Sequence, residues 1–293
     1  MKKVSGKALI MTSAAVVSAA VLAVTASAAA ANVSGYEEIK QRGFALLEQS
    51  GNATVSISTE LIADGRQLYS QSGYSETNED MDAFYTRTEM FAAGEDDYWL
   101  EEYWNGVNKY WRSSDNPTGY SEYLPQYRRQ ESFILTENQK KFLSLLLDVF
   151  TGDLKNYFVT DGNTISVSLD KTQIPELAQS FIAVGAEAAA KEHEDNPDYS
   201  VNGRADLNSI ITQYLYEPVI ESYSLTATLS DDGYLADSNA SVNFSGRDEN
   251  GEWHNATLYI KMEFSDIGST KVRTSDTHSI TPAGIYGRAA EEL

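Results

Sequence analysis

The chain has 293 residues, with 22 Lys and Arg against 43 Asp and Glu, three His and no Cys. The formal net charge of −21 argues against nucleic-acid binding, which depends on neutralising phosphates, and against docking on anionic lipid headgroups. The lack of cysteine excludes disulfides, thiolate metal sites and cysteine nucleophiles, so stability has to come from a hydrophobic core.

The first 28 residues have the pattern of a secretory signal peptide. Three lysines precede an apolar run over residues 8–24, and the small residues Ala26 and Ala28 are typical of a signal-peptidase site. We therefore expect a secreted or extracytoplasmic protein that is cleaved near Ala28. An uncleaved membrane anchor stays open as the alternative, because an apolar stretch of about 20 residues can span a bilayer.

The next elements are a helix and a run of strands. Ser34 and Glu37 form a capping box, which predicts a helix that ends near residue 50. Residues 55–61 alternate apolar and polar side chains, Asp64-Gly65 supplies a tight turn, and another strand is expected over 84–92.

Residues 97–112 carry the best-defined local pattern, a hairpin with a two-residue turn at Asn105-Gly106. This turn pairs Trp104 with Val107 and Glu102 with Lys109, with Leu100 opposite Trp111 on the same face. The other face then carries Trp99, Tyr103, Tyr110 and Arg112.

The second half of the chain mixes helices with strands. A loop is expected over 113–129, helices after Thr136 and after Thr172, and a hairpin at Asp161-Gly162. A three-stranded meander is expected over 223–264.

Antiparallel strands interrupted by helices predict an α+β fold, namely a curved antiparallel sheet, or half-barrel, with about three helices packed on one face. We expect a single domain over 29–268 and an irregular C-terminal tail over 269–293.

This layout resembles the lipoprotein-carrier superfamily, in which helices form a lid over the concave face of a half-open β barrel. The segments Gln173-Ile174-Pro175-Glu176-Leu177 and Gly246-Arg247-Asp248-Glu249-Asn250-Gly251-Glu252-Trp253-His254 are similar to those of uncharacterised secreted proteins of Gram-positive bacteria. The resemblance implies a fold and a ligand cavity, and no catalytic residues come with it. The chain lacks the lipid-anchor cysteine of the anchored members.

The residues with catalytic or metal-binding chemistry do not form a recognisable centre. His193, His254 and His278 stand apart without the spacing of zinc sites, and no G-x-S-x-G nucleophile elbow is present. Glu101 and Glu102 cannot act together on one substrate, because neighbouring strand residues point to opposite faces. We therefore expect no enzymatic activity and no cofactor, and we assign no metal ligands. Calcium binding by the acidic turns stays open, although each of these turns is more simply a hairpin turn.

Three binding roles remain open. The first is a cavity between sheet and helices that holds a lipid or other amphiphile, lined by Leu100, Trp104, Trp111, Phe142, Leu146 and Phe181. The second is a recognition module whose hairpin at 98–112 stacks on cell-wall glycan through Trp99, Tyr103, Tyr110 and Arg112. The third is a membrane-tethered envelope sensor, or a structural partner of an envelope protein.

Overall fold

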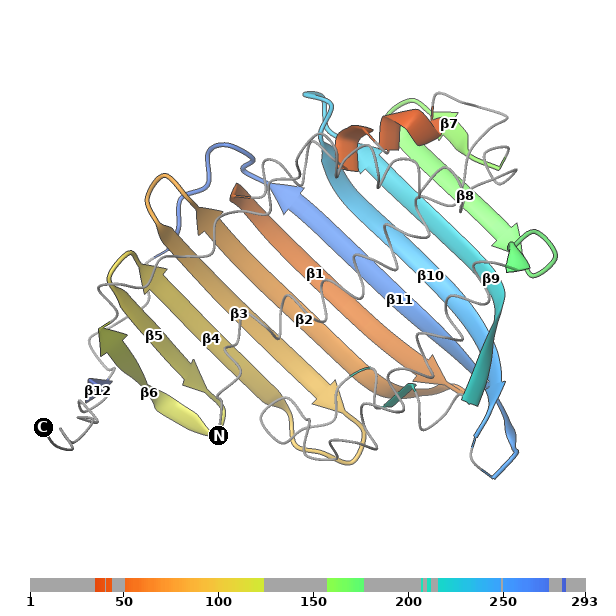
Figure 1. Ribbon diagram of the computed structural model, residues 1–293, viewed down its shortest axis with the longest axis horizontal. Coiled ribbons are helices and arrows are strands. Elements are labelled where there is room, and N and C mark those ends of the chain that lie inside the picture. The colour runs from red at the N-terminus through yellow and green to blue at the C-terminus, as the bar shows by residue number, and fades with distance from the viewer. Residues whose placement is uncertain are drawn as a thin grey trace, which may run out of the picture.

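The structure is a computed structural model of the chain (Figure 1). It describes residues 35–39, 41–43, 51–123, 157–176, 207, 210–211, 216–248, 250–273 and 281–282. Among these residues, a short helix over 35–39 and 41–43 precedes a large sheet. No helix in the described ranges is long and apolar enough to cross a membrane.

The strands of the sheet come from two stretches of the chain. The first stretch forms β1 (Asn52–Ala63), β2 (Arg66–Asn78), β3 (Ala83–Ala92), β4 (Tyr98–Asn105), β5 (Asn108–Ser113) and β6 (Asn116–Tyr123). The second forms β7 (Val159–Asp161), β8 (Thr164–Asp170), β9 (Tyr216–Leu229), β10 (Leu235–Arg247), β11 (Trp253–Ser265) and β12 (Thr281–Pro282).

These strands form one sheet in the order β12-β6-β5-β4-β3-β2-β1-β11-β10-β9-β8-β7. Two antiparallel meanders, β1 to β6 and β7 to β11, join where β1 pairs with β11 (Figure 1). The short β12 pairs with β6 in the parallel sense and forms one edge of the sheet, opposite the edge formed by β7.

Alternation along the strands separates an apolar inner face from a polar outer face. Leu61 lies opposite Leu258 on β11 and Tyr69 on β2, and all three are buried on the inner face. The residue before Leu61, Glu60, pairs with the exposed Tyr259 on the outer face. The short helix contributes Ile39 to the core on the inner face, which is the face turned to the viewer in Figure 1.

The predicted α+β class is wrong, because the described residues are nearly all antiparallel sheet with one short helix rather than about three. Part of the predicted loop over 113–129 is strand β6, which contains Pro117 and Gly119. Turn-forming residues in the sequence favoured a loop, whereas pairing with β5 decides the structure. The helix expected after Thr136 lies outside the described residues, as does most of the one expected after Thr172.

Residues 266–273, which we call the strap, cross the end of the sheet after β11. The Gly268 amide donates to the Asn52 carbonyl at 2.7 Å, and the Asn78 side-chain amide donates to the Thr270 carbonyl at 2.8 Å. The strap then reaches the outer face, where Arg273 pairs with Glu76. The predicted signal peptide lies outside the described residues, while the predicted tail includes the end of the strap and β12.

Candidate ligand-binding site

The inner face of the sheet has two halves of different character. Over β8 to β11 and β1 it is almost wholly apolar, with buried Ile165, Val167, Leu225, Val242, Leu258 and Leu61. Over β2 to β6 the strand register places polar side chains among the apolar ones, including Gln71, Thr86, Thr88, Glu102 and Lys109. The face is therefore amphipathic along the strand order.

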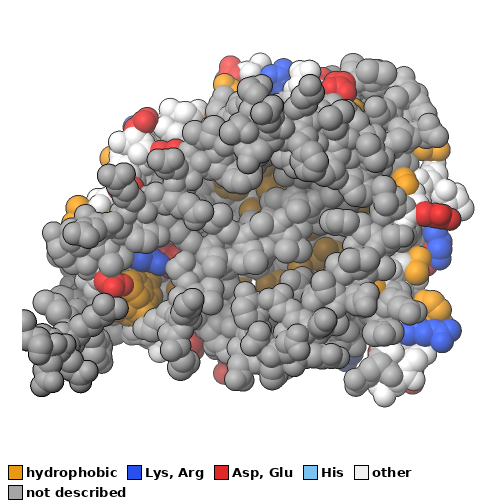
Figure 2. Space-filling model, viewed as in Figure 1, with side chains coloured by type: hydrophobic (Ala, Val, Ile, Leu, Met, Phe, Trp, Pro, Cys, Tyr) orange, Lys and Arg blue, Asp and Glu red, His pale blue; other side chains and the backbone are white. Residues whose placement is uncertain are grey.

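A charged and aromatic cluster lies on the inner face where β4, β5 and β6 meet. Lys109 Nζ is 2.7 Å from Glu102 Oε1 and 5.2 Å from the centre of the Trp111 ring. The Trp111 ring meets the Tyr120 ring edge to face. Burial, together with the nearby Glu122 and Glu102, raises the pKa of Tyr120 to about 12. Figure 2 looks onto this face and shows hydrophobic side chains beside basic and acidic ones at that end of the sheet.

Four buried polar atoms on the inner face have no hydrogen-bond partner among the described residues. They are Thr88 Oγ1, Glu102 Oε2, Thr160 Oγ1 and the Tyr223 hydroxyl, and the residues Thr88, Glu102 and Tyr223 are only 1%, 3% and 3% exposed. Such an atom costs about 1–3 kcal/mol when it stays unpaired. These atoms could therefore form hydrogen bonds with a bound molecule.

Gly73 adds no side chain to the inner face beside Thr88. It pairs with Thr88 on β3 and with Ile57 on β1, so it belongs to the inner-face row. Among the described atoms, a Cβ atom built on Gly73 would meet only the Ile57 carbonyl oxygen within 4 Å, at 4.0 Å. A glycine inside a strand is typical of a place where another molecule or backbone approaches closely.

The residues predicted to line an amphiphile cavity lie on the inner face wherever they are described. Leu100 and Trp104 are buried on β4, and Trp111 is partly buried on β5. Trp104 also donates from Nε1 to Asp82 Oδ1 at 3.2 Å. The other predicted residues, Phe142, Leu146 and Phe181, lie outside the described residues.

The hairpin at 98–112 has a different register from the predicted one. Trp104 pairs with Lys109, and Glu102 pairs with Trp111, so Gly106 and Val107, rather than Asn105 and Gly106, lie between the two strands. The Asn105 side chain accepts hydrogen bonds from the backbone amides of Val107 and Asn108, which closes this turn. Because the register shifts by two residues, each side chain keeps its predicted face.

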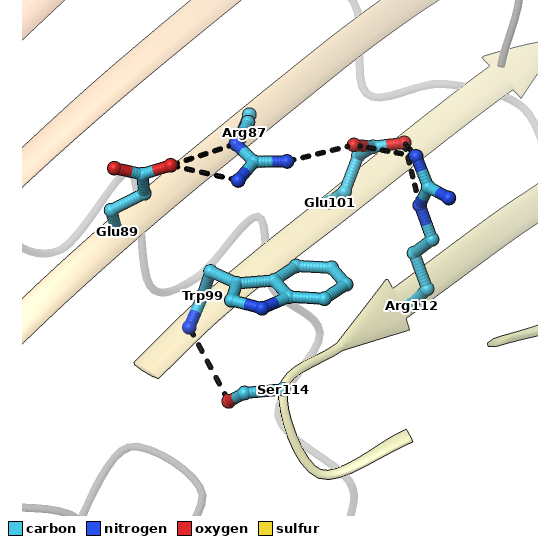
Figure 3. Close-up of polar contacts among 6 residues, drawn as sticks. All are labelled: Arg87, Glu89, Trp99, Glu101, Arg112 and Ser114. Atoms are coloured by element: carbon cyan, nitrogen blue, oxygen red, sulfur yellow. Dashed lines mark hydrogen bonds and ion pairs between the residues drawn. The ribbon is translucent and has the colours of Figure 1, made fainter. Parts of the chain in front are cut away.

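The predicted glycan-stacking residues all lie on the outer face, but their surfaces are engaged by neighbours, as Figure 3 shows for Trp99 and Arg112. The Tyr103 and Tyr110 rings stack on each other, with centres 5.6 Å apart at 27°. The guanidinium carbons of Arg87 and Arg112 are 5.3 and 6.0 Å from the centre of the Trp99 ring. These contacts leave less of a flat aromatic surface than the sequence pattern predicts.

A buried carboxylate holds the two arginines in place. Glu101 is only 4% exposed although it lies on the outer face, and it points away from Glu102 as alternation requires. Its Oε1 accepts from Arg112 Nε at 3.0 Å, and its Oε2 accepts from Arg87 Nη1 at 3.3 Å (Figure 3). The network is consistent with a structural role for Glu101.

A shallow groove on the outer face has a volume of about 350 Å³. Small side chains of paired positions on β1 and β2 form its floor, and charged or aromatic ones border it: Ser56, Ser58, Ser72, Tyr74, Arg87, Glu89, Lys261 and Glu263. This groove was not predicted from the sequence. Serines at alternate positions are a signal for it, but its border depends on the pairing of β1 with β11, about 200 residues apart.

His254 lies between two carboxylates at the turn end of β10, β11 and β1. Its Nδ1 is 2.6 Å from Asp64 Oδ2, and its Nε2 is 3.6 Å from Asp248 Oδ2. The hydrogen bond with Asp64 raises the pKa of His254 and lowers that of Asp64. Asp248, Glu252 and His254 are close enough to share a cation. However, Asp248 Oδ1 already accepts from the amides of Asn250 and Glu252, which is an ordinary turn cap.

No family model matches the chain, and no curated protein matches it. Among solved structures, the chain is similar to one titled "Crystal structure of bifunctional dehydratase-cyclase domain in ambruticin biosynthesis". The identity is 12%, over 78% of this chain and 79% of that chain, with a TM-score of 0.13. A likeness of this size carries no argument about fold or activity, so the function has to be argued from the site itself.

Proposed function

We propose that the protein is a secreted or envelope-associated, non-enzymatic binding protein that holds a lipid or other amphiphile against the inner face of its sheet. The observation that carries the proposal is that β8 to β11 and β1 give this face mostly apolar side chains, whereas β2 to β6 add polar and charged ones such as Gln71, Glu102 and Lys109. A molecule with one apolar and one polar end matches both halves at once. The signal-peptide pattern and the negative charge are consistent with work outside the cytoplasm.

Gly73 offers the most direct test of this proposal. Its backbone is not in the left-handed region, so a valine fits a strand at this position, and no described side chain lies within 4 Å of an added Cβ atom. We expect Gly73→Val to keep the thermal stability of the parent and to weaken binding of a fluorescent long-chain acyl probe by about tenfold, measured by equilibrium titration.

Ser72→Val is the matched control, because the same side chain is added one residue away on the exposed outer face. It is expected to bind the probe like the parent. If Gly73→Val and Ser72→Val both bind with the parent's affinity, the ligand does not lie on the inner face.

A second candidate function is recognition of cell-wall glycan at the outer groove. The specific observation in its favour is a floor of serine hydroxyls bordered by Tyr74, Arg87 and Lys261, which is chemistry that sugars use. Retention of the parent protein, but not of Tyr74→Ala or Trp99→Ala, on purified peptidoglycan would support this candidate over the first.

A further inference from the structure

We propose that the polar end of the bound amphiphile is an uncharged hydroxyl group that bridges Glu102 and Thr88. The inference rests on the proposed function and adds to it the place and the chemistry of the polar end. It follows from the two buried atoms on β3 and β4 that lack hydrogen-bond partners in the described part of the chain, Thr88 Oγ1 and Glu102 Oε2.

The strand register places these two atoms within reach of one ligand group. Thr88 pairs with Leu100, and Glu102 lies two residues further along β4 on the same face. Such diagonal neighbours have Cα atoms about 7–8 Å apart, and their side chains extend toward the same space. Gly73, which pairs with Thr88 on the other side, adds no side chain to fill that space.

The hydrogen-bonding types of the two atoms select the ligand group. A carboxylate oxygen only accepts, whereas the threonine hydroxyl both donates and accepts. A ligand hydroxyl can donate to Glu102 Oε2 and accept from Thr88 Oγ1, so it satisfies both atoms.

The charges around the two atoms disfavour charged ligand groups of either sign. Lys109 Nζ already lies 2.7 Å from Glu102 Oε1, so an ammonium group would meet a second cation at short range. A carboxylate or phosphate would face the negative charge of Glu102. An acylglycerol or another acyl chain ending in hydroxyl groups is therefore the expected ligand class.

The test compares two probes and one isosteric variant of the secreted chain. The probes are 1-monolauroylglycerol, which has free hydroxyls, and methyl laurate, which has the same acyl chain and none. We expect the parent to bind the glyceride about tenfold more tightly than the ester, the effect of about one hydrogen bond. Thr88→Val, which removes only the hydroxyl, should bind the glyceride about tenfold less tightly and the ester unchanged.

Thermal unfolding without ligand gives a second readout. Because the Thr88 hydroxyl has no described partner, the Thr88→Val variant should be at least as stable as the parent. A clear loss of stability would mean that the hydroxyl is already bonded within the protein, which overturns the assignment. Equal affinity of the parent for both probes also overturns it while leaving the amphiphile proposal intact. Failure of the parent to bind either probe instead overturns the proposed function.

Discussion

Replacing Trp104 with alanine is expected to lower the free energy of unfolding by about 4 kcal/mol, the usual cost of removing a large aromatic side chain from a core. Trp104 is 0% exposed, lies next to buried Phe84 on the inner face, and donates a hydrogen bond to Asp82. Its loss leaves a cavity and an unpaired acceptor together. Urea unfolding followed by circular dichroism measures the change.

Trp253→Ala is the matched control for this prediction. Trp253 is 60% exposed, and its ring has one notable contact, with the guanidinium of Arg247 at 4.9 Å. We expect a loss of about 1 kcal/mol or less, the size of an exposed cation-π contact. Equal losses for the two variants would show that the inner face is not the covered face of the sheet.

Replacing Arg273 with alanine is expected to lower the free energy of unfolding by about 2–3 kcal/mol at pH 7. Glu76 is buried, and it accepts from the Arg273 amide at 2.6 Å and from Arg273 Nε at 2.9 Å. The guanidinium also lies 4.5 Å and 4.8 Å from the ring centres of Tyr74 and Tyr85. Without the Arg273 side chain, the buried carboxylate keeps its desolvation cost and loses the guanidinium, and only the amide of residue 273 and the Tyr74 hydroxyl still donate to it.

This loss should depend on pH with a definite sign. Burial on its own raises the pKa of Glu76, but hydrogen bonds from Arg273 and Tyr74 outweigh it, so the pKa lies below the ordinary value of 4.5. The contribution of the pair is therefore present above pH 4.5 and is lost as the pH falls through the lowered pKa. Urea titrations at pH 7 and below pH 4 should show the gap between parent and variant closing.

Lys271→Ala removes an exposed cation from the same strap and should change stability by less than about 0.5 kcal/mol at either pH. If the stability difference between the parent and Arg273→Ala stayed constant with pH, it would contradict the role assigned to Glu76. If that difference were as small as the one for Lys271→Ala, the strap would not be held by the pair of Arg273 and Glu76.

Local features of the sheet could be predicted from the sequence because they depend on neighbours in the chain. Alternation over residues 55–61 identified the faces of β1, and Asp64-Gly65 adopts the expected turn with φ of 50° and 76°. The hairpin at 98–112 was placed correctly, but its register depended on the Asn105 side chain, which caps a turn at Gly106 and Val107 instead of occupying the turn itself.

Features that depend on segments far apart in the chain could not be predicted from the sequence. The pairing of β1 with β11 joins residues about 200 positions apart, and the parallel pairing of β12 with β6 has no local signature. The outer groove exists only because of the first of these pairings. Whether the atoms Thr88 Oγ1 and Glu102 Oε2 find a hydrogen-bond partner also depends on three-dimensional neighbours, so no pattern of residue types predicts it.

Native mass spectrometry of the protein secreted by its own host, recorded before and after solvent extraction, tests the amphiphile proposal most directly. The proposal predicts an additional bound mass of lipid size that extraction removes. A protein mass that is the same before and after extraction and equals that of the bare chain would contradict a tightly held amphiphile, and would favour recognition of glycan at the outer groove.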